Sequence, residues 1–146
     1  MANDPIIRKI AVIFATDVVG FSVLMQGNEN ATLKSLRACR DILDRLFEEH
    51  GGRIFNTAGD SVLAEFQSAV STVICATEFQ KLVKQRNLSM SEESQMWFRI
   101  GLNMGDVIIE GTNVYGEGVN NAARLEAFCQ PGGVSLSKTI YDFASQ

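Results

Sequence analysis

The sequence has few of the residues on which crosslinks, zinc sites and covalent catalysis depend. It contains three cysteines and one histidine in 146 residues, with no Cys-x-x-Cys pair and no Cys/His cluster. This argues against a disulfide framework, a structural zinc site and a Ser/His/Asp or Cys/His catalytic arrangement. Cys39 and Cys75 fall in helical patterns, where we expect buried, unreactive thiols in a reducing compartment. His50 ends a helix, and we assign it no catalytic role.

Long apolar runs and an excess of basic residues are also absent. No stretch reaches the roughly 18 apolar residues that span a membrane, and residues 1–10 contain no apolar signal core. We therefore expect a cytoplasmic domain, or one held at the cytoplasmic face of a membrane through flanking domains. With 13 basic and 17 acidic residues, the net charge of −4 argues against a nucleic-acid partner. A small phosphorylated substrate remains compatible, because backbone N–H groups and a metal ion can offset its charge locally.

What is present indicates one ordinary globular domain. The apolar fraction is 46% and the charged fraction 21%, and the length is that of a single domain. We expect this domain to occupy residues 1–146, with its core at about 9–137.

Hydrophobic periodicity predicts strands and helices in alternation. The β-branched run at residues 9–19 is typical of a strand buried on both faces, and a helical period follows at 24–49. A hairpin is predicted at 53–66, a helix at 69–84 capped by Ser68, and a second hairpin at 96–111 punctuated by Gly101 and Gly105. A glycine-rich entry from 115 then leads into the helix VNNAARLEAF at 119–128, followed by the strand VSLS at 134–137 and a short helical tail. This order predicts an α+β sandwich with a ferredoxin-like core and helices on one face of the sheet.

Two aspartates are the first candidates for a functional site. Asp17 follows the apolar strand, and Asp60 lies at the tip of the first hairpin. Taken alone, an aspartate at a strand end is more often a cap or a surface residue than a metal ligand. If the hairpin neighbours the first strand, however, the two carboxylates converge at one edge of the sheet, and paired carboxylates repel unless a cation lies between them. Backbone N–H groups after Asp17 could then receive phosphate oxygens.

The residues also resemble a known family. The order and spacing of four motifs are similar to the successive signatures of bacterial-type class III adenylate and guanylate cyclases, over residues 9–137. The motifs are FATDVVGFS, TAGDSVLAEF, RIGLNMGDVI and YGEGVNNAARLE. The resemblance implies the α/β sandwich of that family. Because family members continue with a further hairpin, we expect the C-terminal part of the domain to be truncated, and no triphosphate-binding lysine can be assigned.

The resemblance implies a two-metal site shared between two chains. Asp17, Asp60 and the Val18 carbonyl would hold two Mg²⁺ or Mn²⁺ ions. The segment after Val18 would bind the triphosphate through Val19, Gly20, Phe21 and Ser22. Asn120 and Arg124, one helical turn apart, would reach the site of a partner subunit in a homodimer. The implied reaction is attack of the ribose 3′-hydroxyl on the α-phosphate, which yields a cyclic nucleotide for signalling and pyrophosphate.

The choice of purine base is the least defined part of this interpretation. Asn56 and Asn113 occupy the two positions that read the base in the family, and an asparagine offers both a donor and an acceptor. We expect ATP as the substrate and cyclic AMP as the product, with a guanylate cyclase or a catalytically inactive nucleotide-binding module as alternatives. Asp106 we leave outside the site, as an exposed turn residue or a group that orients Arg124.

Overall fold

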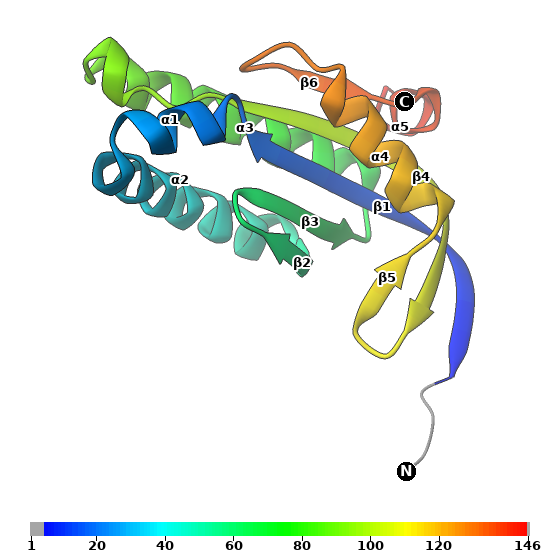
Figure 1. Cartoon of the computed structure of the whole chain (residues 1–146). Helices are drawn as coiled ribbons and strands as arrows, with labels where there is room; N and C mark the ends of the chain where they lie inside the picture. The colour runs from blue at the N-terminus through cyan, green and yellow to red at the C-terminus, as the bar shows by residue number, and fades with distance from the viewer. Residues whose placement is uncertain (1–4, 146) are drawn as a thin grey trace.

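A six-stranded sheet forms the centre of the molecule. The computed structural model describes residues 5–145, and Figure 1 shows the arrangement of its elements. In chain order they are β1 (Ile6–Val18), α1 (Phe21–Gly27), α2 (Glu29–His50), β2 (Arg53–Ala58), β3 (Ser61–Phe66), α3 (Ala69–Leu88), a 3₁₀ turn η1 (Glu92–Ser94), β4 (Phe98–Glu110), β5 (Asn113–Tyr115), α4 (Glu117–Ala127), β6 (Val134–Leu136) and α5 (Lys138–Ala144). The first four residues and the last residue of the predicted domain lie outside the described range.

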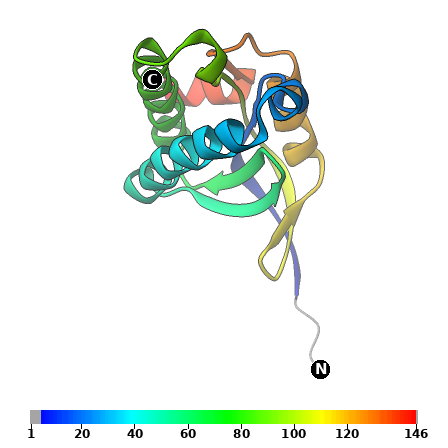
Figure 2. The same cartoon turned by 60° about the vertical axis from the view of Figure 1, so that its left-hand side comes forward.

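The ferredoxin-like core is confirmed. The strands follow the order β2-β3-β1-β4-β5, and β6 pairs in parallel with β4. The long strands β1 and β4 are antiparallel neighbours from Ile6 opposite Glu110 to Val18 opposite Phe98. Figure 2 shows α2 and α3 together on one face of this sheet. Burial of apolar side chains on this face is the main source of stability.

A cluster of aromatic rings fills the larger core, beneath α2 and α3. The ring of Phe14 on β1 meets that of Phe47 on α2 with centroids 5.1 Å apart, and Phe66 on β3 completes the group at 5.6 Å from Phe47. Edge-on packing of this kind adds stability beyond the buried area.

The opposite face of the sheet is covered by α4, so the prediction of helices on one face only is wrong. Alternate residues of β1 contribute to two cores, one on each face of the sheet. Val12 and Phe14 face α2 and α3. Ala11 and Ile13 face α4, where they pack with Ala122. The prediction that β1 is buried on both faces is therefore confirmed. Small side chains in this second core let the helix lie close to the strands.

The predicted second hairpin at residues 96–111 is also wrong. Gly101 and Gly105 do not interrupt a strand, because β4 runs unbroken through both. A Cβ atom at Gly101 would collide with the carbonyl oxygen of Ala122 and the backbone nitrogen of Glu126 on α4. The glycine therefore marks a close approach of helix to strand, and the true hairpin turn comes later, between β4 and β5.

The predicted helix at residues 24–49 is two helices, which separate at Asn28. This residue has an extended backbone (φ −159°, ψ 97°), and its side-chain oxygen accepts a hydrogen bond from the Ala31 N–H at 3.1 Å. It thus caps α2. The predicted cap at Ser68 is confirmed, since its Oγ accepts from the Ser71 N–H at 3.1 Å, although α3 continues beyond the predicted end to Leu88.

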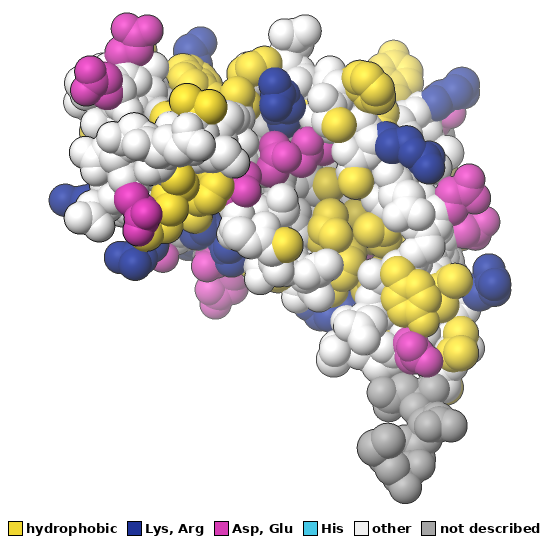
Figure 3. All heavy atoms as spheres, viewed as in Figure 1, with side chains coloured by type: hydrophobic (Ala, Val, Ile, Leu, Met, Phe, Trp, Pro, Cys, Tyr) yellow, Lys and Arg dark blue, Asp and Glu magenta, His cyan; other side chains and the backbone are white. Residues whose placement is uncertain are grey.

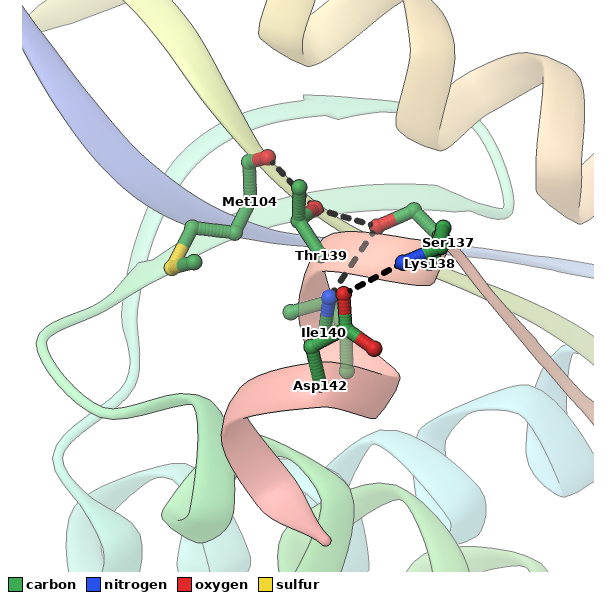
Figure 4. Close-up of polar contacts among 6 residues, drawn as sticks. All are labelled: Met104, Ser137, Lys138, Thr139, Ile140 and Asp142. Atoms are coloured by element: carbon green, nitrogen blue, oxygen red, sulfur yellow. Dashed lines mark hydrogen bonds and ion pairs between the residues drawn. The ribbon is translucent and has the colours of Figure 1, made fainter. Parts of the chain in front are cut away.

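The last helix is held on the sheet by its first turn (Figure 4). The Thr139 hydroxyl donates to the Met104 carbonyl at 2.8 Å, and Ser137 caps the helix by accepting from the Ile140 N–H. Lys138 forms an ion pair with Asp142 at 2.8 Å on the outer side of the same helix. No helix within residues 5–145 is both long and apolar enough to cross a membrane.

Candidate metal and nucleotide site

The structure brings the two predicted aspartates together at one end of β1. Asp17 is the penultimate residue of that strand, and Asp60 follows Gly59, whose φ of +60° makes the tight turn between β2 and β3. Because β3 pairs with β1, this turn lies beside the strand end, where Asp60 Oδ2 accepts a hydrogen bond from the Val18 N–H at 2.8 Å. In Figure 3 acidic side chains gather over the end of β1.

A further carboxyl group, which the sequence interpretation missed, is buried near Asp17. Glu126 lies on the face of α4 that packs against the sheet, is 9% exposed, and is close enough to Asp17 for the two carboxyls to influence each other's pKa. The signal in the sequence was a glutamate on an apolar face, because Val119, Ala122 and Glu126 recur with helical spacing and all three are buried. A buried carboxyl at such a position points to a specific partner.

Burial and like charge govern the ionisation of this group of carboxyls. Burial is the largest cause that raises the pKa of Asp17. Glu126 has the next largest effect and lowers this pKa, the charge of Asp60 raises it, and Arg99 lowers it least. Burial, followed by the hydrogen bond and the charge of Asp17, raises the pKa of Glu126 to about 8. Burial and mutual repulsion therefore both disfavour full ionisation of this group of carboxyls.

The nearest cation does not neutralise the site. Arg99 lies opposite Asp17 on β4, but its Nε donates to the Cys129 carbonyl at 2.9 Å. Asp17 Oδ1 is buried and has no hydrogen-bond partner in the described part of the chain. An orphaned buried carboxylate oxygen beside a second carboxylate is the arrangement that a divalent cation stabilises.

The donor set fits an open metal site. Carboxylate oxygens are ligands that Mg²⁺ and Mn²⁺ prefer. Within residues 5–145 no three His, Cys, Asp or Glu side chains are grouped so as to enclose an ion. Asp17 and Asp60 would thus leave coordination positions for a substrate, as magnesium sites that bind triphosphates do.

The segment after Asp17 offers fewer free N–H groups than predicted. The Val19 N–H donates to the Trp97 carbonyl at 2.8 Å, so in this structure it already has an acceptor. Gly20 turns the chain with a φ of +63°, and α1 begins at Phe21 with no side-chain cap. The N–H groups of Phe21 and Ser22, in the first turn, have no acceptor within the helix and lie just beyond Asp17 in the chain.

Asn120 and Arg124 are not brought to the aspartates of the same chain. Both are exposed on the side of α4 opposite Glu126, and Arg124 Nη1 donates to Asn121 Oδ1 at 2.6 Å. Since Glu126 is the residue of this helix that faces Asp17, a helix with this orientation directs the Asn/Arg pair away from its own metal site.

The two candidate base-reading residues lie on the outer strands of the sheet. Asn56 is on β2 and Asn113 on β5, at opposite ends of the strand order, and both are exposed. The sheet curls enough to bring these strands into contact, and Arg53 Nη1 donates to the Thr112 carbonyl at 3.3 Å. The two asparagines are thus closer to each other than the strand order suggests.

Two residues assigned no role lie outside this site in the structure. His50 Nε2 is 3.3 Å from Glu78 Oε2, at the far end of α2. Asp106 is exposed, but it lies within β4 opposite Ile10 and not in a turn.

Comparison with known proteins decides the family. Residues 4–146 match the model of the adenylate and guanylate cyclase catalytic domain. The chain belongs to this family. The cyclase domain is 41% identical over 144 residues to a putative adenylate cyclase 3 of Rhizobium meliloti (strain 1021), a match that covers 98% of the domain and 24% of the relative. The domain thus spans about a quarter of that relative's length.

Solved structures support the same assignment. The crystal structure of an adenylate/guanylate cyclase/hydrolase from Silicibacter pomeroyi is 34% identical, with a TM-score of 0.89 over 97% of the cyclase domain and 83% of the other chain. An adenylyl cyclase from P. aeruginosa is 22% identical, with a TM-score of 0.84 over 97% of this domain and 83% of its own chain, and shows the shared fold. The predicted α+β sandwich of the cyclase type is confirmed.

Proposed function

We propose that the cyclase domain converts ATP to 3′,5′-cyclic AMP and pyrophosphate with the help of divalent metal ions. The observation that carries the proposal is the pair of carboxylates at the end of β1, where the Val18 N–H donates to Asp60 and the buried Asp17 Oδ1 has no hydrogen-bond partner among residues 5–145. ATP is favoured over GTP because the 41% identical relative is described as a putative adenylate cyclase.

Each residue of the proposed site would have a distinct role. Asp17 and Asp60 would hold two Mg²⁺ or Mn²⁺ ions, with the Val18 carbonyl as a further oxygen ligand. When bound, the ions supply activation of the 3′-hydroxyl and neutralisation of triphosphate charge. The N–H groups of Phe21 and Ser22 would receive phosphate oxygens. The 3′-oxygen would form its bond to the α-phosphorus as the bond to pyrophosphate breaks, and the hydroxyl proton would leave to solvent, so no protein nucleophile is required.

The other half of the site would come from a second copy of the chain. Asn120 would position the ribose and Arg124 would stabilise charge on the α-phosphate, and both point away from the aspartates of their own chain. A two-fold dimer would contain two such composite sites. Apolar side chains available for an interface are exposed on the outer half of β1, where Ile6 is 66% and Ile10 60% accessible. Asn56 and Asn113 would read the base.

An assay with both nucleotides tests the reaction. Purified domain is incubated with ATP or GTP and Mn²⁺, and the cyclic product is measured. We expect cyclic AMP from the wild type and a loss of about a hundredfold or more in Asp17→Ala and Asp60→Ala. Asp41→Ala, at an exposed position on α2, is the matched control and should leave the rate unchanged. Cyclic GMP as the main product would assign a guanylate cyclase, and no product from either nucleotide would leave a nucleotide-binding module.

Complementation tests the shared site. Mixing Asp17→Ala with Arg124→Ala chains should restore about a quarter of the wild-type activity, because half of the randomly formed dimers are mixed and each has one intact site. Inactivity of the mixture, with mixed dimers demonstrated by a tag on one chain, would refute the shared site.

A further inference from the structure

One side chain joins the two strands that would carry the base-reading asparagines. Arg53 is the first residue of β2, the strand of Asn56, and its guanidinium reaches the turn that precedes Asn113. We propose that Arg53 is a positioning residue for purine selectivity: by joining β2 to the β4–β5 hairpin, it sets the distance between Asn56 and Asn113. This inference rests on the proposed function and concerns the part of that site that contacts the base.

Both strands lie at edges of the sheet, where the ladder holds them from one side only. The strands β2 and β5 end the strand order, and each pairs with a single neighbour, β3 and β4 respectively. β5 is three residues long and follows a turn in which Gly111 has a φ of +63°. The register of β2 shifts between Ile54 and Asn56. Because short or irregular edge strands open more readily than central ones, the separation of these two edges depends on contacts beyond the ladder.

The guanidinium of Arg53 supplies such a contact with two different nitrogens. Nη1 donates to the Thr112 carbonyl of the hairpin at 3.3 Å, and Nη2 donates to Glu65 Oε1 on β3 at 2.9 Å. Within residues 5–145, no other side chain links β2 to the β4–β5 hairpin by a hydrogen bond or an ion pair. The planar fork of an arginine makes both bonds at once, whereas the compact ammonium of a lysine at this position would lack the second arm.

Glu65 anchors this bridge in the sheet. It is 6% exposed, and its other oxygen, Oε2, forms an ion pair with Lys9 Nζ on β1 at 2.9 Å. Burial alone would raise the pKa of Glu65, but the hydrogen bonds and charges of Lys9 and Arg53 lower it, so the carboxylate is ionised at neutral pH. Glu65 lies opposite Ile13 of the second core, on the face of the sheet that α4 covers. The bridge therefore extends from the central strand β1 to the hairpin.

Base selectivity should be sensitive to this bridge because it depends on hydrogen-bond geometry. Adenine and guanine differ in the donors and acceptors along one edge of the ring, and an asparagine amide matches either base only from the correct position. A site that hydrogen-bonds one base rejects the other because its polar groups would remain unpaired, and this requires placement within about 0.5 Å. Loss of the bridge should therefore reduce the preference for one purine and leave the binding of metal ions and phosphates unchanged.

Nucleotide binding without turnover is the first measurement. The analogues 3′-deoxy-ATP and 3′-deoxy-GTP lack the attacking hydroxyl, so isothermal titration calorimetry with Mn²⁺ can give their dissociation constants for the whole domain. We expect Arg53→Met, which retains an unbranched stem without a donor, to reduce the ratio of the two constants by about fivefold or more. Arg53→Lys should reduce the ratio equally, because it keeps an ion pair with Glu65 but loses the arm to Thr112. Lys9→Met removes the other cation beside Glu65 and leaves the bridge in place, so it is the matched control and should keep the wild-type ratio.

Two further readouts separate positioning from a structural role. Lys9→Met should lower the melting temperature at least as much as Arg53→Lys does, yet only Arg53→Lys should change the ratio. Inorganic pyrophosphate, which has no base, should bind every variant as it binds the wild type. If the ratio follows the melting temperature across the variants, or if pyrophosphate binding weakens together with nucleotide binding, the effect is general loosening and the inference is overturned.

The same titrations distinguish failure of this inference from failure of the proposed reaction. Unchanged ratios in both Arg53 variants, or equal binding of the two analogues by the wild type, would overturn the role of Arg53 and leave the cyclase reaction standing. If the wild type binds the analogues selectively but forms no cyclic product from ATP or GTP, the proposed reaction fails, and the ratios still decide the role of Arg53. Absence of binding by both analogues would overturn both proposals.

Discussion

Replacement of Gly101 by alanine tests whether the close contact between β4 and α4 positions the site. The new Cβ would lie 2.9 Å from the Glu126 Cα and nearer still to the Ala122 carbonyl oxygen and the Glu126 nitrogen, all of them backbone atoms. Since ordinary contacts begin near 3.4 Å, the helix must move away from the strand. Side-chain rotation cannot relieve this overlap.

The expected loss of stability is large for one methyl group. Overpacking typically costs about 1–3 kcal/mol, and we expect a value near the upper end because backbone must move. Relief of the entropic cost of a strand glycine offsets about 0.5–1 kcal/mol of this, which leaves a net loss of about 2 kcal/mol. For a chain of this length the melting temperature should fall by about 4–8 °C, as measured by differential scanning calorimetry. Cyclase activity at 20 °C should fall as well, because α4 carries Asn120 and Arg124 of the proposed site.

Gly27 is the matched control for this substitution. It is the last residue of α1, a Cβ there would meet nothing within 4 Å, and its φ is not positive. Gly27→Ala should therefore be neutral or stabilise the fold by up to about 1 kcal/mol through helix propensity. If Gly101→Ala melts within about 2 °C of Gly27→Ala, the close approach of α4 to β4 does not exist in solution. The burial of Glu126 against β4 would then have no support.

Three further predictions concern proton binding, thiols and one buried amide. Because folding raises the pKa of Glu126 from 4.5 to about 8, the folded protein retains a proton that the unfolded chain loses; this stabilisation is complete below about pH 4.5 and is lost as the pH rises through about 8. The melting temperature of metal-free protein should fall over that range, and Glu126→Gln should flatten the profile; parallel profiles would contradict this. All three thiols are buried, and burial raises the pKa of Cys75 to about 12. Ellman's reagent at pH 8 should therefore label none of them rapidly in the native protein and all three in denaturant. Rapid labelling of any thiol in the native protein would contradict this packing. Gln80 Nε2 donates to the carbonyls of Phe98 (2.9 Å) and Gly133 (2.8 Å), so Gln80→Ala should cost about 2–4 kcal/mol in urea unfolding, and a loss below about 1 kcal/mol would refute that role.

Local sequence signals predicted most elements but not how they pack. The β-branched run before Asp17, the Gly59 turn and the Ser68 cap each depend on residues close in the chain, and all three predictions are confirmed. The errors occurred at residues whose role depends on a contact with a segment far away in the sequence. Gly101 was interpreted as the end of a strand because the contact that requires a glycine there is not local. That contact is with the backbone of α4, more than 20 residues away in the sequence.

Some features of the candidate site were likewise predictable from local sequence, and others were decided by the tertiary structure. Asp17 and Asp60 could be paired from the sequence because a strand end and a hairpin tip are local features, and antiparallel pairing of neighbouring strands is the common arrangement. The family could likewise be identified from motifs, since their order and spacing are properties of the chain. Only the tertiary structure showed that Glu126 is buried against β4, that the Val19 N–H is already bonded and that Arg124 lies on the exposed side of α4. Periodicity reveals that a helix has two faces, but the face that meets the sheet is decided by close packing between segments far apart in the sequence.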